Sequence, residues 1–288
     1  TRIGSRHYPL GPMSLAADVQ RARAASGFTL IELLVVIAVV ALLVGILVPS
    51  LGGARRQARI TVCGGRLQQV SVGLTLYENE FPGFLPQHMG PLPDGGESVI
   101  GSLFGGKRGQ LPFYGINEIG AAQRPLNPYV TSAGIPAEES SDPGVPPIEM
   151  PQFRSPIDEG LRSTGLPIPG LERTDLMYDF LGSSYALNDH APDRNPYGDD
   201  YPTLIPSGGG RLPPVEQPTK TWVVGTHTIY NYDDGGDRRQ MWFGSAGVRA
   251  NLAFLDGHVG LSIPVAEGQT PTTDDYTFLP QTRWLDRF

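Results

Sequence analysis

A single carboxylate stands in the longest apolar run of this sequence. From Phe28 to Val48 the chain has 21 residues, and Glu32 is the only charged one. An acidic side chain costs about 2.5–3.5 kcal/mol near the centre of a membrane span and less near an end, so its presence suggests a partner. Glu32 lies one helical turn after Phe28. If the chain were cut between Gly27 and Phe28, the new α-amino group could neutralise Glu32 of the same chain or of a neighbouring copy.

A second group of residues could bind a metal ion near the C-terminal end. Oxygen-bearing side chains are crowded in the segment Asn-Tyr-Asp-Asp-Gly-Gly-Asp, as Asn231, Asp233, Asp234 and Asp237. Calcium takes roughly 6–8 oxygen ligands from flexible loops, so these residues are a candidate calcium site. The spacing is not that of an EF-hand, and solvated turns are often this acidic. A calcium site and a plain surface turn therefore both remain open.

Catalytic patterns are missing from the rest of the sequence. It contains no Gly-x-Ser-x-Gly, no His-Glu-x-x-His and no phosphate-binding glycine loop. His190, His227 and His258 are too scattered to predict a metal triad. The excess of 29 acidic over 22 basic residues argues against nucleic acid as a partner. We therefore predict no enzymatic activity and no cofactor other than calcium.

The apolar run itself predicts a membrane-spanning helix. As a helix, residues 28–48 reach roughly 31 Å, the thickness of a bilayer's hydrocarbon core. No polar stripe follows Glu32, as a soluble helix would require. Residues 1–27 contain four arginines and one acidic residue and are predicted to be a leader peptide. Cleavage before the apolar core fits better than cleavage after it, since the core then stays in the mature protein.

The helix is predicted to continue over residues 49–80, softened at Pro49. Apolar side chains recur there every three or four positions, as Ile60, Cys63, Leu67, Val70, Leu74 and Tyr77. Such a stripe needs a sheet to cover it. Cys63, the only cysteine, is expected to be a buried helix residue.

Residues 81–288 are predicted to form one β-rich domain, because 37 glycines and 28 prolines indicate many loops. Residues 87–218 form an irregular insertion in which Tyr129–Thr131 and Ser183–Asn188 could be strands. Further strands are predicted at Lys220–Val224 and on both sides of Asp256-Gly257. We expect this pair to be a two-residue hairpin turn with positive φ at both residues.

The string Gly-Phe-Thr-Leu-Ile-Glu before the apolar run resembles the N-terminus of type IV prepilins and type II secretion pseudopilins. The resemblance implies cleavage after Gly27 by prepilin peptidase and N-methylation of Phe28. It implies a role for Glu32 in filament assembly and places Pro49 at a matching helix-softening position. It also implies a cytoplasmic leader and an exported C-terminal domain.

A second resemblance lies near the C-terminus. Asn-Leu-Ala-Phe-Leu-Asp-Gly-His-Val resembles a signature of prepilin-like exported proteins, in which a histidine precedes the Asp-Gly pair by ten positions. Here Ala246 stands at that position, so no role is carried over for the histidine. Major pseudopilins bind calcium in a C-terminal loop, which adds to the case for the acidic segment above.

The fold class expected is therefore α+β and pilin-like, with a long N-terminal helix packed on an antiparallel sheet. The expected function is a structural subunit of a type II secretion pseudopilus or a type IV pilus-like filament, anchored in the inner membrane with its domain in the periplasm or at the cell surface. The alternative is a tethered ligand-binding or hydrolytic domain that uses the prepilin segment only for export. Its aromatic residues would suit carbohydrate, namely Trp222, Tyr230, Tyr232 and Trp242.

Overall fold

The computed structural model describes residues 28–132, 134–135, 148–190, 202–231, 240–244, 247–268 and 270–282, with the side chains of residues 49 and 50 left aside. The chain divides into two units, residues 1–50 and residues 51–288. The elements are one long helix and short helices and strands in antiparallel sheets. The predicted α+β class is confirmed.

Helix α1 (Leu30–Glu80) contributes its first part to one unit and its remainder to the other. The helix assignment runs through Pro49, as predicted. The helix ends at Glu80, where the Phe81 amide still donates to the Tyr77 carbonyl at 2.8 Å. Pro82 then lacks the amide that a further turn would need. Gly83 follows with φ +77°, a conformation that favours glycine.

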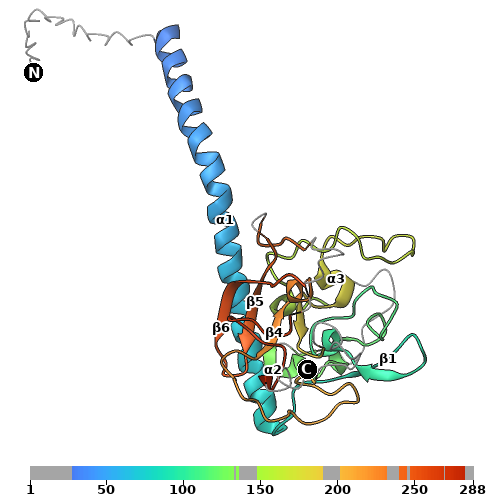
Figure 1. Ribbon diagram of the computed structural model, residues 1–288. Helices are drawn as coiled ribbons and strands as arrows, with labels where there is room; N and C mark the ends of the chain where they lie inside the picture. The colour runs from blue at the N-terminus through green and yellow to red at the C-terminus, as the bar shows by residue number, and fades with distance from the viewer. Residues whose placement is uncertain are drawn as a thin grey trace, which may run out of the picture. The chain divides into compact units, whose positions relative to one another are not determined.

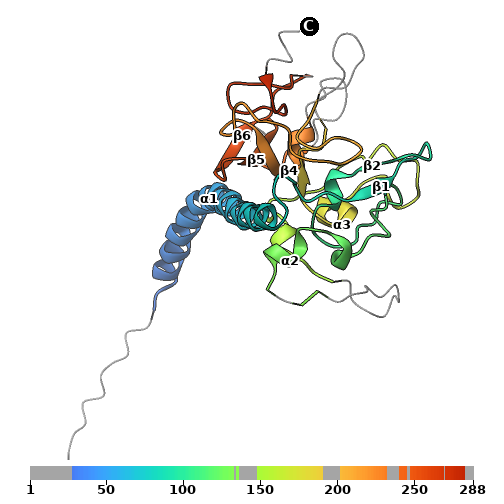
Figure 2. The same cartoon turned by 90° about the horizontal axis from the view of Figure 1, so that it is seen from below.

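The second unit contains a four-stranded antiparallel sheet in the order β3-β4-β5-β6. Figure 2 shows β4, β5 and β6 side by side with α1 next to them. The pairing of neighbours along the chain makes the sheet a meander, with strands β3 (Tyr185–Leu187), β4 (Trp222–Thr226), β5 (Arg249–Phe254) and β6 (Val259–Pro264). Strands β3 and β4 bear out the strand predictions made around residues 183–188 and 220–224.

The predicted apolar stripe of α1 shares one hydrophobic core with residues of the sheet. Figure 1 shows the later part of α1 beside β5 and β6. Five members of the stripe are buried and Tyr77 is partly buried, the five being Ile60, Cys63, Leu67, Val70 and Leu74. Two glycines of α1 do not break the helix but let neighbouring side chains approach its backbone closely. A Cβ at Gly64 would lie 2.3 Å from Cδ2 of Leu261 on β6, and one at Gly73 would lie 2.5 Å from Cγ2 of Val130.

Polar contacts fix the register between α1 and the sheet. The buried Asn251 side chain donates to the Ile60 carbonyl at 3.2 Å and accepts from the Ser262 amide at 2.8 Å. One amide group thus joins α1, β5 and β6. The Gln68 side chain donates to the Gly257 carbonyl at 3.2 Å, which ties the helix to the β5–β6 loop. Burial of apolar surface stabilises the packing of α1 on the sheet, and these hydrogen bonds fix the register between them.

The β5–β6 connection differs from the predicted two-residue turn. Ala253 pairs with Val259, and the Phe254 amide donates to the His258 carbonyl, so three residues lie in the loop. Gly257 has φ +90°, whereas Asp256 is not among the residues with positive φ. This is the geometry of a three-residue hairpin loop, a tight turn followed by a left-handed glycine. Asp256 instead accepts from the His258 amide at 3.2 Å.

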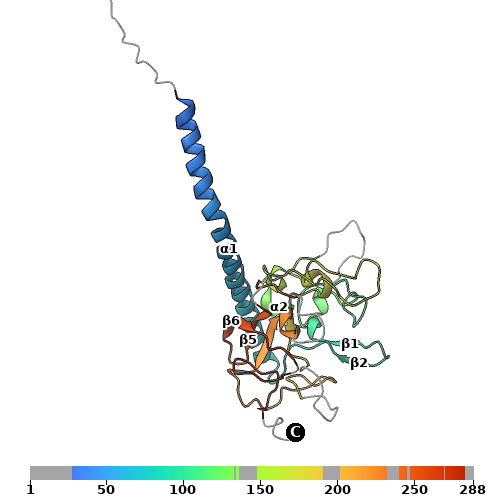
Figure 3. The ribbon, with the colours of Figure 1, turned by 45° about the horizontal axis from the view of Figure 1, so that its top comes forward.

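Short elements and loops fill the region before β4. They are β1 (Met89–Pro91), β2 (Glu97–Val99), α2 (Asn127–Val130), α3 (Met177–Leu181) and the 3-10 turns Gly101–Leu103, Ala121–Gln123 and Pro151–Phe153. Figure 3 shows the β1–β2 hairpin apart from the four-stranded sheet. The strand predicted at Tyr129–Thr131 is wrong, because residues 127–130 form α2 and the Thr131 amide closes its last turn on Asn127.

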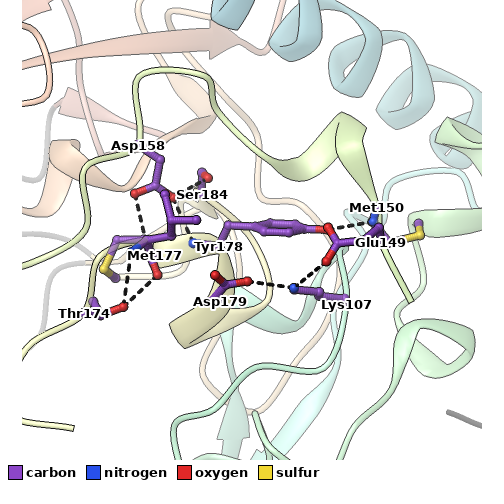
Figure 4. A network of polar contacts seen from close by, with 10 residues as sticks. Lys107, Glu149, Met150, Asp158, Thr174, Met177, Tyr178, Asp179 and Ser184 are labelled. Carbon is purple, nitrogen blue, oxygen red and sulfur yellow. Dashed lines mark hydrogen bonds and ion pairs between the residues drawn. The ribbon is translucent and has the colours of Figure 1, made fainter. Parts of the chain in front are cut away.

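Buried polar groups hold this region in place (Figure 4). The Asp158 carboxylate accepts hydrogen bonds from the Met177 and Tyr178 amides, each at 2.9 Å, and from the Ser184 hydroxyl at 2.6 Å. It thereby caps α3 and joins it to the start of β3. Burial nevertheless raises the pKa of Asp158, against the effect of these bonds. Lys107 makes a second anchor, with its Nζ 2.7 Å from Asp179.

Candidate functional site

The first unit exposes a continuous apolar helix. Its large apolar side chains between Leu30 and Val48 are all exposed, and Phe28 just before the helix is 71% exposed. The helix is long and apolar enough to cross a membrane. Soluble proteins rarely expose apolar patches of this extent, and such patches mark membrane or protein contacts. This segment is the candidate site of anchoring and assembly.

Glu32 has local partners at the start of α1. Its Oε2 accepts hydrogen bonds from the amide and the hydroxyl of Thr29, both at 2.8 Å. The Glu32 amide donates in return to the Thr29 hydroxyl at 3.2 Å. This is a capping box, with Thr29 at the N-cap and Glu32 three residues later. Sequence reasoning missed it, although the Thr-x-x-Glu spacing carries that signal.

The capping box places the Glu32 carboxylate next to the predicted processing point. Phe28 precedes the Thr29 amide that Glu32 contacts, so an α-amino group on Phe28 would begin one residue away from the carboxylate. Gly27 lies outside the described residues, and cleavage between Gly27 and Phe28 stays a prediction. Pro49 lies within α1, and its predicted softening of the helix also stays a prediction.

Most of the predicted calcium ligands lie outside the described residues. Asp233, Asp234 and Asp237 belong to this group. Ala246, which stands at the position of the signature histidine, also lies outside the described residues. Asn231 is described and is buried, and its Nδ2 atom has no hydrogen-bond partner there. The calcium prediction therefore stays a prediction.

Two of the aromatic residues proposed for carbohydrate are core residues. Trp222 is fully buried and packs edge-on against Phe278, with ring centroids 5.1 Å apart. Trp242 is also buried, and its indole N–H donates to the Gly160 carbonyl at 3.1 Å. Neither can form a binding platform, which corrects that part of the alternative. Tyr230 is half-buried, and Tyr232 lies outside the described residues.

Two of the scattered histidines line one cavity in the second unit. The cavity has a volume of about 350 Å³ and an apolar floor that includes Ile116 and Leu181. Its polar wall contains His190, His227 and Tyr230. The His190 ring stacks on Tyr230 with centroids 4.1 Å apart. No spacing in the sequence indicates this grouping, because 37 positions separate the two histidines.

Asp189 organises the polar wall of this cavity. Its carboxylate accepts from the Gly101 amide at 2.7 Å and from the Tyr230 hydroxyl at 3.1 Å, and it lies 2.8 Å from Nδ1 of His190. Burial would raise the pKa of Asp189, but these bonds together lower it. Burial also lowers the pKa of His227 to about 4, against a hydrogen bond with Gln240. Among the described residues, no group of three or more His, Cys, Asp or Glu could hold a metal ion.

The N-terminal segment that contains the apolar helix and its capping box is similar to known prepilin-type segments. The family described as the prokaryotic N-terminal methylation motif matches residues 22–48. The type IV wide pilus major component PilA4 of Thermus thermophilus is 58% identical over 40 residues, which make up 14% of this chain. These residues span 30% of that relative. No solved structure matches the chain.

These likenesses confirm the predicted resemblance to type IV prepilins. They support a pilin-like N-terminal segment. Together with the exposed apolar helix, they indicate membrane anchoring.

Proposed function

We propose that this chain is a subunit of a type II secretion pseudopilus or a type IV pilus-like filament. Prepilin peptidase cleaves it after Gly27, and Phe28 is then N-methylated. The mature chain is held in the inner membrane by residues 28–48, with its C-terminal domain in the periplasm or at the cell surface. When the subunit leaves the bilayer, its apolar helix must be buried against other protein. The same helix of neighbouring copies or of other pseudopilins provides that contact.

The observation that carries this proposal is the single carboxylate at the exposed end of the apolar helix. Thr29 supplies two hydrogen bonds to Glu32 but no positive charge. A carboxylate in an apolar surrounding gains more from a cation than from neutral donors. The α-amino group of a neighbouring copy supplies that cation and sets the register between the two helices.

The experiment is photo-cross-linking of the full chain in native membranes, with a photoreactive side chain at Val36. The unaltered chain gives a ladder of linked copies. Glu32→Leu removes the carboxylate and is expected to abolish the ladder. Glu78→Leu removes an exposed carboxylate from the other end of α1 and is the matched control, expected to keep the ladder. A full ladder from Glu32→Leu would contradict the proposal.

The cavity beside Asp189 and His227 supports a second candidate function, a tethered ligand-binding or hydrolytic domain. Glu32 argues against it, because a segment that serves only as an anchor gains nothing from an acid inside the membrane. Under this alternative Glu32→Leu leaves export and ligand binding intact, and copies do not cross-link in either protein. The same experiment therefore separates the two functions.

A further inference from the structure

Three arginines without ion pairs follow the apolar segment. Arg55, Arg56 and Arg59 are all exposed. In the described part of the chain, they make no hydrogen bond to a side chain and no ion pair. Exposed arginines on a helix are commonly paired with carboxylates one turn away, but residues 51–77 contain no acidic residue. As far as the structure describes the chain, the three charges are therefore available to a partner.

These arginines line one wall of a cavity of about 180 Å³. The opposite wall includes Ile157, the carboxylate residue Glu159 and the buried Trp242. Glu159 makes no ion pair with the arginines, so the lining keeps an excess of positive charge. A cavity of this size is smaller than the roughly 300–1,000 Å³ of drug-sized ligand sites, and it suits a small anionic group.

A second cavity, of about 440 Å³, is lined by the next turns of α1. On the helix side the two cavities are lined by residues that recur with the helical period, namely Gly52, Arg55, Arg56, Arg59, Val62, Gly65, Arg66 and Gln69. Residues 151–152 form the opposite wall of the larger cavity. The Oε1 atom of Gln152 is buried without a hydrogen-bond partner in the described chain. Of the two cavities, the one lined by Arg55, Arg56 and Arg59 is nearer to the membrane-spanning residues in the chain.

Chain length keeps these arginines close to the bilayer. Arg55 follows Val48 by seven residues, which span about 10 Å as a helix and at most about 25 Å when fully extended. Side chains on a helix lean toward its N-terminus, which here is the side of the apolar segment. Arginine also presents several donors in a fork that matches phosphate oxygens.

We propose that the cavity lined by Arg55, Arg56 and Arg59 binds the phosphodiester headgroup of an anionic membrane lipid. The headgroup occupies the smaller cavity, where the arginines neutralise it, and Trp242 forms an apolar wall beneath. Arginines near a membrane surface that carries anionic lipids are attracted to it by about 1 kcal/mol each. The inference rests on membrane anchoring and not on filament assembly, so it can fail or hold independently of the ladder experiment.

To test this, phosphatidylglycerol or phosphatidylcholine is titrated into the full chain in detergent. Native mass spectrometry then measures how much of each lipid stays bound. We expect tighter retention of phosphatidylglycerol. Arg55→Gln with Arg59→Gln should weaken it by about fivefold per arginine. Arg162→Gln with Arg173→Gln removes two exposed arginines elsewhere and should change it less than twofold. Circular dichroism verifies that both variants fold.

Three results would overturn the inference. The first is equal retention of phosphatidylglycerol by the two double variants. The second is release of the bound lipid by inorganic phosphate at a similar concentration, since the site would then take any small phosphate. The third is loss of cross-linking between copies with unchanged lipid retention, which would assign the arginines to a neighbouring subunit.

Discussion

Thr29 and Glu32 satisfy each other's polar groups at the first turn of α1. The Thr29 amide and hydroxyl each lie 2.8 Å from Glu32 Oε2, and the Glu32 amide lies 3.2 Å from the Thr29 hydroxyl. Glu32 is therefore stabilised before any other subunit arrives. Assembly, as proposed, adds a cation to a carboxylate that is already oriented.

The capping box predicts a specific effect of losing the Thr29 hydroxyl. Thr29→Val keeps the shape of the side chain and removes two of the three hydrogen bonds. An N-cap of this type stabilises a helix by about 1 kcal/mol, so the amides of residues 30–33 should exchange about fivefold faster. Hydrogen exchange of the chain in lipid nanodiscs measures this. Thr29→Ser, which retains the hydroxyl, should behave like the unaltered chain, and equal rates in the Val variant would contradict the capping role.

Close packing at Gly73 predicts opposite effects of one substitution at two positions of α1. Gly65→Ala meets no atom within 4 Å and should stabilise the fold by up to about 1 kcal/mol through helix propensity. Gly73→Ala brings a Cβ to 2.5 Å from Val130 Cγ2 and 3.4 Å from the Tyr129 carbonyl. It should cost about 1–3 kcal/mol. Urea unfolding of the full chain in detergent compares the two, and equal effects would show that α2 does not pack here as described.

The low pKa of His227 predicts a loss of stability in acid. Its pKa is lowered to about 4 in the folded state by burial, whereas an unfolded histidine titrates near 6.5. Between these values the unfolded state binds the extra proton, so stability falls as pH falls from 6.5 to about 4, by about 2 kcal/mol. Unfolding free energies at pH 7 and pH 4.5 measure this. His227→Gln should reduce the difference, and an unchanged difference would assign it to other groups.

The calcium prediction at Asn231, Asp233, Asp234 and Asp237 is tested by metal removal. An ion that binds only the folded state stabilises it, and more so as its concentration rises above the Kd. The midpoint of thermal unfolding should therefore be higher in millimolar calcium than in a sample treated with a chelator. Asp234→Asn with Asp237→Asn should abolish the shift, whereas Asp274→Asn with Asp275→Asn should keep it. A midpoint that does not respond to calcium would leave the segment as a solvated turn.

The sequence predicted the elements whose pattern is local and periodic. The stripe from Ile60 to Leu74 predicted the buried face of α1, because helix period and burial coincide there. The β-branched and aromatic residues around Trp222 predicted β4 for a similar reason. The membrane segment could be predicted from composition alone, since every position from Leu33 to Val48 is apolar or glycine.

What the sequence did not predict depends on contacts between distant residues. The Asp158 network joins positions 19 to 26 residues apart, and no spacing rule marks it. The cavity residues His190 and His227 meet only because β3 pairs with β4. The predicted hairpin is confirmed, but its two-residue turn was wrong for a subtler reason. Asp-Gly suits both a two-residue turn and the end of a three-residue loop, and the pairing of Ala253 with Val259 selects the second.

The most direct test of the proposed function is the intact mass and N-terminal sequence of the protein from native membranes. We predict a mature chain that begins at Phe28 and carries one added methyl group. That result would establish the prepilin route and the α-amino cation that Glu32 requires. A chain that keeps the residues before Phe28, or begins near Ala54 and so lacks the apolar helix, would contradict the account.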